Sequence, residues 1–201
     1  VNGMYVPMVS GKGWVGVLLK KMLFNTDVEF SGLSTASNLN ERAYVPSTGD
    51  IKSYGDIWTG MYDGVNRTND VIEGIEQSPL FAAADKTKPS RLMHYYGEAK
   101  VLRAMYYLEL VRNWGDVPYR RTSAGNKDEL FIGATDRNTI LTDMINDLIE
   151  VEPLMLYAEE SDRGVEAASR EFCQALIARI ALQRGGWSLR PDYDNPAAVG
   201  A

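Results

Sequence analysis

Apolar residues recur every three or four positions along four long segments of the chain, which is the spacing of one face of an α-helix. The first segment runs from about Ser53 to Gln77. Ser53 followed by Asp56 resembles a capping box at its start, and Ser78-Pro79 ends it because a proline disfavours the helical conformation of the residue before it. The predicted inward residues are Ile57, Met61, Val65, Ile72 and Ile75.

The second helix, from about Ser90 to Trp114, carries two neighbouring apolar stripes. One stripe comprises Leu92, Tyr95, Ala99, Leu102, Tyr106 and Leu110, and the other comprises Val101, Met105, Leu108 and Val111. A surface helix needs only one such stripe. Two stripes therefore indicate a helix that is buried between neighbours on two sides, as in a stack of helices. Gly115 stands where a left-handed C-terminal cap belongs, and Pro118 follows it.

Two further helices are predicted in the second half of the chain. One runs from Thr135 to about Glu150, where Thr135 with Asp136 suits a helix N-terminus, and Pro153 closes it. The other runs from about Ser169 to Arg184 and ends at Gly185-Gly186. The predicted inward residues are Ile140, Met144, Ile145, Leu148 and Ile149 in the first, and Phe172, Leu176, Ile180 and the small residues of Ala175–Ala178 in the second.

The remaining segments carry weaker patterns, and none alternates over a full strand length. We expect two short helical pieces in Gly3–Asn25, interrupted at Gly11–Gly13, a loop at Asp27–Pro46, and connections at Phe81–Lys88 and Arg120–Gly133. The long helices form two successive pairs, which is typical of tetratricopeptide-like (TPR-like) repeats, although the strict repeat period is not met. The predicted fold class is all-α, an α–α superhelix of TPR-like repeats.

Composition agrees with a globular domain, since 45% of the 201 residues are hydrophobic and 24% are charged. The net charge of −6, without a Lys/Arg run, argues against a nucleic-acid partner, which would need a basic surface. No stretch has the length of an apolar transmembrane helix. Val1–Tyr5 starts inside a helical pattern and Pro191–Ala201 is rich in turn residues, so we expect one domain over residues 1–201 that is truncated from a longer polypeptide.

Candidate catalytic residues are few. His94, the only histidine, is expected at a helix surface or interface, and Cys173 is expected to be inert packing, although a Cys–His nucleophile pair remains an alternative. The carboxylates of Glu159–Asp162 would serve glycoside hydrolysis only in a geometry that no spacing indicates. Asp192–Asn195 offers oxygen ligands for Ca²⁺, but a polar turn is the better interpretation. With no phosphate loop and no His-rich metal pattern, we predict no cofactor, no metal site and no enzyme activity.

Aromatic residues are the remaining candidates for binding, because the flat C–H faces of sugar rings stack on them while polar groups fix orientation. The segment 24–58 carries side chains of these types. The predicted ligand-binding residues are Asn38, Arg42, Tyr44, Tyr54 and Trp58, with Asn40 beside them. An alternative interpretation, which we favour for Trp58 and Tyr62, is that these two rings pack between helices.

The segment Gly97–Pro118 reads G-E-A-K-V-L-R-A-M-Y-Y-L-E-L-V-R-N-W-G-D-V-P, and it closely resembles the hallmark helix of the SusD/RagB family. The matching positions are Glu98, Ala99, Leu102, Arg103, Ala104, Tyr106, Leu110, Trp114, Gly115, Val117 and Pro118. Lys100 and Val101 replace the more usual Arg and Phe. Shorter resemblances follow in family order over most of the chain: Trp58, Tyr62, Arg67, Asn69 and Val71-Ile72 before this segment, and Asp147-Leu148, Pro153-Leu154, Ala175–Leu182 and Gly186–Pro191 after it.

The resemblance implies a function. Members of this family are lipid-anchored, non-catalytic proteins on the outer face of the outer membrane in Bacteroidetes. They capture oligosaccharides or other nutrients beside a TonB-dependent, SusC-like transporter, and their fold combines TPR-like helices with an irregular second part. The resemblance thus implies a surface-exposed lipoprotein of polysaccharide utilization whose partners are a glycan and that transporter. The chain contains neither a lipobox cysteine nor the family's second part, so any lipid anchor lies outside it.

Two other functions stay open on the sequence. TPR-like stacks commonly offer grooves to partner segments, so a protein–protein interaction scaffold without its own glycan site is the main alternative. A carbohydrate-active enzyme is the third.

Overall fold

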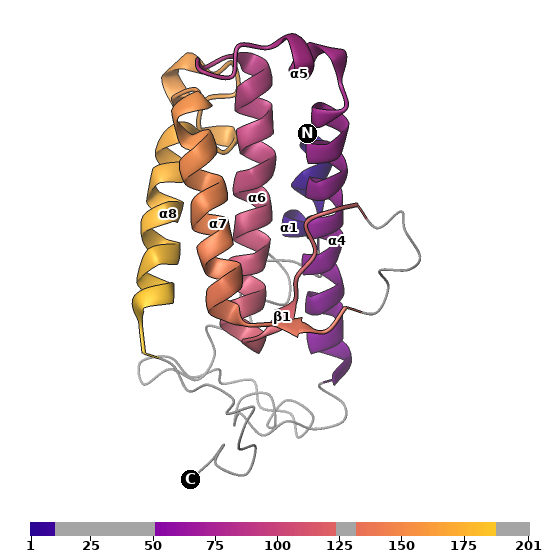
Figure 1. The fold of residues 1–201 in the computed structure, drawn as a ribbon. Helices are drawn as coiled ribbons and strands as arrows, with labels where there is room; N and C mark the ends of the chain where they lie inside the picture. The colour runs from indigo at the N-terminus through magenta and orange to yellow at the C-terminus, as the bar shows by residue number, and fades with distance from the viewer. Residues whose placement is uncertain (11–50, 124–131, 188–201) are drawn as a thin grey trace, which may run out of the picture.

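The computed structural model describes residues 1–10, 51–123 and 132–187, and four long helices dominate it (Figure 1). These helices are α4 (Ile51–Glu76), α6 (Arg91–Trp114), α7 (Arg137–Val151) and α8 (Arg170–Gly185). They stand side by side in chain order, and each runs antiparallel to the one before it (Figure 1). This arrangement confirms the predicted all-α, TPR-like pairing of helices. None of the described helices is both long enough and apolar enough to span a membrane.

Shorter elements complete the described chain. They are the 3₁₀ helices Asn2–Met4, Glu152–Leu154, Ala158–Glu160 and Gly164–Glu166, the short helices α1 (Val6–Val9) and α5 (Pro79–Ala83), and the strands β1 (Val117–Pro118) and β2 (Ala134–Thr135). Two of them correct the sequence prediction. The helix α5 begins where only a connection was expected, because the Ser78 side chain accepts a hydrogen bond from the Leu80 N–H and caps it. The antiparallel pair of β1 and β2 is too short to produce an alternating pattern.

The helix ends are capped largely where the sequence predicted. The side chains of Ser90 and Ser169 each accept a hydrogen bond from the backbone N–H three residues later. The third helix begins one position after Asp136, whose carboxylate accepts two backbone N–H groups, whereas Thr135 belongs to β2. Ser53 lies inside α4 rather than at its cap. Gly115 has φ of 76°, as predicted, but its ψ of −117° is outside the left-handed helical region.

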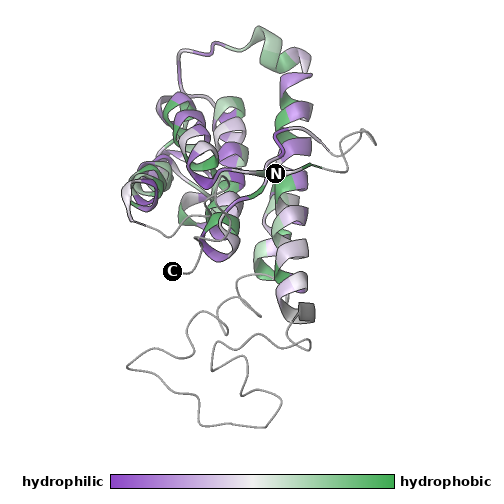
Figure 2. Cartoon of the chain, turned by 60° about the horizontal axis from the view of Figure 1, so that its bottom comes forward, coloured by the Kyte–Doolittle hydropathy of each residue, from purple (hydrophilic) through white to green (hydrophobic). Residues whose placement is uncertain are grey.

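The core is built around α6, which is buried along most of its length between α4 on one side and α7 on the other. Hydrophobic and hydrophilic residues alternate around the helices, as expected when each buries only part of its circumference (Figure 2). Inward predictions are wrong at Ile149 on α7 and at Phe172, Ala175 and Ala178 on α8, all of which are exposed. Ile149 is 56% exposed because the inward face of α7 is centred on Met144 and Leu148. Phe172 is 40% exposed because α8 meets the other helices mainly through Cys173, Leu176 and Ile180.

A buried ion-pair network joins three of the helices at mid-height. The Arg103 guanidinium on α6 donates to Asp147 Oδ2 on α7 at 2.7 Å and to Asn69 Oδ1 on α4 at 3.0 Å. Arg121 donates to the other Asp147 oxygen at 2.7 Å, and Lys100 donates to Glu150 at 2.9 Å. Arg103 is only 2% exposed. Lys100 and Asp147 are also buried, whereas Arg121 and Glu150 are exposed, so the network has a buried centre in which each charge needs its partner.

Hydrogen bonds hold the N-terminal segment, residues 1–10, against the helical stack. Tyr106, wholly buried, donates its hydroxyl to the Met4 carbonyl at 2.7 Å. Tyr5 donates to the Glu98 carboxylate and accepts the Ala168 N–H at 3.0 Å. Arg163 donates to both oxygens of the same carboxylate, at 2.8 and 3.0 Å. We call Tyr5, Glu98 and Arg163 the N-terminal clasp, because they hold residues 1–10 against α6 and the segment before α8.

Close packing of α4 on α6 gives a first test. Gly64 faces the Tyr106 ring so closely that a Cβ atom there would overlap it, and that ring is buried and hydrogen-bonded. We expect Gly64→Ala to lower the free energy of unfolding by about 1–3 kcal/mol, the usual range for overpacking a core. Urea denaturation followed by circular dichroism measures it.

Gly74→Ala is the matched control on the same helix, because a Cβ there meets none of the described atoms within 4 Å. The better helix propensity of alanine should raise the free energy of unfolding by about 0.5–1 kcal/mol. Equal effects of the two substitutions would show that α4 does not approach α6 as described.

Candidate functional site

A group of aromatic side chains gathers where α4 begins and α6 ends. The Trp58 ring lies 4.8 Å from the Tyr62 ring and 5.3 Å from the Trp114 ring, measured between centroids, and the second contact is edge-to-face. The Tyr62 hydroxyl donates to the Pro118 carbonyl at 2.7 Å, and this bond ties α4 to β1. With Tyr54, one turn earlier on α4, these residues form what we call the aromatic end.

Two of the five predicted ligand-binding residues thus lie together at this end. Tyr54 is 40% exposed, whereas Trp58 is half-buried and packs against the core, as the alternative interpretation held. Asn38, Arg42 and Tyr44 lie outside the described residues, as does Asn40. The assignment of all five residues to a ligand site stays a prediction.

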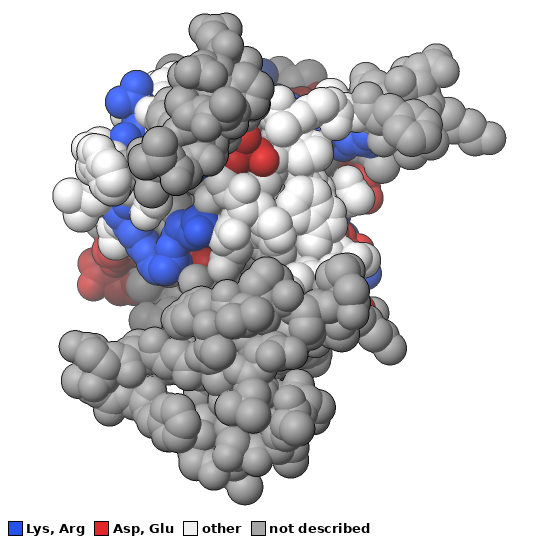
Figure 3. Space-filling view, turned by 90° about the horizontal axis from the view of Figure 1, so that it is seen from below, with Lys and Arg blue, Asp and Glu red and all other residues white. Residues whose placement is uncertain are grey.

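Seen from below, the described residues that are in view show an area of uncharged side chains, with a group of basic side chains and a few acidic ones beside it (Figure 3). Aromatic rings that are partly exposed in an uncharged setting suit the apolar faces of a ligand that also carries hydroxyl groups.

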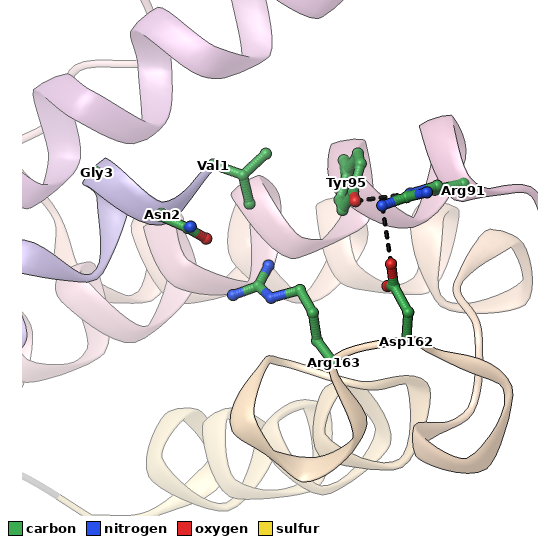
Figure 4. Close-up of a pocket in the computed structure, with 7 residues that line it drawn as sticks. All are labelled: Val1, Asn2, Gly3, Arg91, Tyr95, Asp162 and Arg163. Atoms are coloured by element: carbon green, nitrogen blue, oxygen red, sulfur yellow. Dashed lines mark hydrogen bonds and ion pairs between the residues drawn. The ribbon is translucent and has the colours of Figure 1, made fainter.

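A cavity of about 710 Å³ lies at the opposite end of α6 (Figure 4). Its lining comprises Val1, Asn2, Gly3, Arg91, Tyr95, Asp162 and Arg163. Arg91 donates to the Tyr95 hydroxyl at 2.8 Å and to the Asp162 carboxylate at 2.8 Å, and Arg163 extends toward the N-terminal turn (Figure 4). The sequence contained no signal for this cavity, because its walls come from three segments that are far apart in the chain.

His94 and Cys173 do not form a catalytic pair. His94 is 2% exposed, and its Nδ1 accepts the Leu156 N–H at 3.2 Å. Burial lowers the pKa of His94, which is therefore neutral at pH 7. The Cys173 thiol is fully buried and directed at the Leu148 carbonyl, and burial raises the pKa of this thiol to about 12. His94 thus lies at an interface between elements, and Cys173 is packing, as predicted.

Two of the three carboxylates in Glu159–Asp162 are engaged in structural contacts. Glu160 accepts the Tyr157 N–H, and Asp162 pairs with Arg91. Within residues 1–10, 51–123 and 132–187, no three His, Cys, Asp or Glu side chains are grouped so that they would hold a metal ion. The predicted polar turn at Asp192–Asn195 lies outside the described residues.

Comparison with protein families finds one that matches most of the chain. The model of the family described as "Starch-binding associating with outer membrane" matches residues 8–182. The SusD-like protein P25 of Formosa agariphila is 27% identical over 137 residues, which are 67% of this chain and 24% of that protein. A SusD-like protein of Bacteroides ovatus is 26% identical over 132 residues, 65% of this chain and 22% of that protein. The chain therefore spans about a quarter of the curated relatives that it matches.

Solved structures share the fold. A SusD homolog from Bacteroides thetaiotaomicron superposes with a TM-score of 0.72 at 19% identity, over 98% of this chain and 37% of that one. A laminarin-binding SusD-like protein superposes with a TM-score of 0.61 at 20% identity, over 99% of this chain and 42% of that one. At sequence identities of 19–20%, these superpositions establish only the helical fold. Membership of a family rests on the match of the family model to residues 8–182.

The burial of Cys173 predicts that it will not react in the folded protein. Only the thiolate is alkylated, and the raised pKa leaves almost none at pH 8. Alkylation by iodoacetamide, followed by mass spectrometry, should be slower by a factor on the order of a hundred or more than in 8 M urea.

Ala175→Cys places a thiol on the exposed side of the same helix and serves as the control. It should react quickly under the same native conditions. Rapid native alkylation of Cys173 itself would contradict its assignment as inert packing.

Proposed function

Because this chain belongs to the SusD-like family, we propose that it is the helical part of a non-catalytic glycan-capture component that works with a TonB-dependent transporter at the cell outer membrane. The observation that carries the proposal is the family match over residues 8–182, whose description joins starch binding to the outer membrane. The laminarin-binding SusD-like protein that shares the fold adds support for a glycan ligand.

The aromatic end is the part of the chain that we assign to the glycan. Tyr54 offers a partly exposed ring one turn before Trp58, which packs against Trp114. Asn38, Arg42 and Tyr44 would supply hydrogen-bonding groups and a second ring. A sugar needs both kinds of contact, since its C–H faces are apolar and its edge carries hydroxyl groups.

The transporter partner and the surface location rest on family membership. A SusC-like, TonB-dependent transporter is the partner that the family implies, and a lipid anchor outside this chain would hold the protein at the outer membrane. Co-purification from detergent extracts of the native host tests this part directly. We expect an antibody against the chain to recover a TonB-dependent transporter at near-equal stoichiometry, and recovery of the chain without any such transporter would contradict the partnership.

Replacing Tyr54 tests the glycan assignment. Tyr54→Ala should weaken binding to the recognised polysaccharide about tenfold, equivalent to about 1.4 kcal/mol, because a stacking surface is lost. Tyr44→Ala combined with Tyr54→Ala should weaken it further. Isothermal titration with soluble starch and with laminarin measures the affinities, and circular dichroism checks that each variant is folded.

Phe172→Ala is the matched control, since Phe172 is also 40% exposed but lies on α8. It should leave glycan affinity unchanged. If Tyr54→Ala behaves like this control, the ligand site is elsewhere in the protein, although glycan capture itself stands. If neither polysaccharide binds the unmodified protein, glycan capture of these two classes is wrong.

A protein-interaction scaffold is the second candidate, and the outer side of α8 favours it. Leu182 is 79% exposed there and Trp187, just after the helix, is 89% exposed. Large apolar side chains on the last described helix of a stack suit contact with another polypeptide. A scaffold without a glycan site would bind the transporter and show no affinity for polysaccharides, so the two measurements above separate the candidates.

A further inference from the structure

The cavity of about 710 Å³ at the start of α6 has the size of a ligand site, and it is open to solvent and lined mainly by polar side chains. Arg91 and Tyr95 come from the first turns of α6, Asp162 and Arg163 from the segment before α8, and Asn2 from the N-terminal turn (Figure 4). The lining therefore combines an aromatic ring with hydrogen-bond donors and acceptors. That combination matches a ligand whose hydroxyl groups both donate and accept.

The charges around the cavity favour a neutral ligand over an anion. Arg91 already pairs with Asp162 at 2.8 Å, and Arg163 is held by both oxygens of Glu98. An anion would meet guanidinium charges that a carboxylate already neutralises, and competing for Arg163 would weaken its pairing with Glu98, whose side chain is fully buried. A sugar hydroxyl can instead add hydrogen bonds to paired groups without displacing their partners.

The N-terminal clasp gives the cavity a fixed shape. Arg163 and Tyr5 meet on the same Glu98 carboxylate, and the Arg163 guanidinium lies 5.6 Å from the centre of the Tyr5 ring. Tyr5 in turn accepts the Ala168 N–H, so the N-terminal turn and the segment before α8 are locked together. A wall that is already ordered before binding loses little conformational entropy when a ligand arrives.

The cavity is well separated from the aromatic end. Tyr95 precedes Trp114 on the same straight helix, and the rise of an α-helix places them about 28 Å apart. The first and last turns of α6, which carry them, lie at opposite ends of the bundle (Figure 1). One small sugar cannot contact both, so any binding at the cavity is a separate event.

From these observations we infer that the cavity between the start of α6, the N-terminal turn and Arg163 is a second binding site for a neutral glycan segment. It would lie about 28 Å from the aromatic end. The inference rests on the proposed glycan-capture function and deepens it, because two sites on one rigid helix raise the avidity for a long polysaccharide that reaches both.

Nuclear magnetic resonance with short sugars tests the inference residue by residue. Maltotriose and laminaritriose are the neutral probes, and a trisaccharide of galacturonic acid is the anionic one. We expect the neutral probes to shift the backbone amides of Tyr95, Asp162 and Arg163 in a saturable way. Tyr95→Ala should abolish those shifts, or weaken the fitted affinity at least tenfold, while any shifts at Tyr54 and Trp58 persist.

Tyr157→Ala is the control at the same end of the molecule. An arginine lies over the ring of Tyr157, as one does over Tyr95, but Tyr157 does not line the cavity. This variant should keep the chemical-shift changes at the cavity. That result would show that the loss in Tyr95→Ala does not come simply from removing a tyrosine that stacks with an arginine.

The outcomes separate this inference from the proposed function. Shifts confined to the aromatic end would overturn the second site and leave glycan capture intact. Tighter binding of the anionic probe at the cavity would overturn the assignment of a neutral ligand. An absence of shifts anywhere with both neutral probes would contradict the inference and, for these two classes of glycan, the proposed function.

Discussion

The ion pair between Arg103 and Asp147 is the interaction on which the remaining architecture depends. It joins α6 to α7 in the interior, and the same guanidinium reaches α4 through Asn69. Arg121, from the segment after β1, completes the coordination of Asp147. Losing one member of a buried pair typically costs about 3–5 kcal/mol, because the other charge stays desolvated without a partner. Helices that share this centre cannot slide past one another independently.

That constraint is what makes the two ends of the stack usable as binding surfaces. The aromatic end depends on Trp58 of α4 meeting Trp114 of α6, and the cavity depends on Tyr95 of α6 facing the segment that leads into α8. Both contacts are set by the axial position of α6 relative to its neighbours. Gly64 contributes to the same alignment of α4 and α6, because the absence of a side chain there leaves room for the Tyr106 ring. The described residues therefore act as a rigid frame that holds separated surfaces at a constant distance.

Much of this frame was predictable from the chain, and the exceptions share a cause. Periodicity located the four long helices, and the two stripes of the second one correctly indicated burial on two sides. The same method treats charged positions as outward, so it could not show that Arg103 and Glu98 are buried, because their burial depends on partners distant in sequence. That Tyr54 and Trp58 lie together could be predicted because they are one helical turn apart in the chain, and their role in ligand binding stays a prediction. The cavity was not, since neither Asn2 nor Arg163 carries a local signal.

The N-terminal clasp also has a consequence for the order in which the chain assembles. The contacts among α4, α6, α7 and α8 join neighbours in the sequence, whereas Tyr5 bonds to Glu98 across 93 residues and to Ala168 across 163. Closing such long loops costs more conformational entropy than pairing two helices that are neighbours in the sequence. We therefore expect the helical stack to form early and residues 1–10 to dock late, so that the cavity walls close only in the final stage of folding.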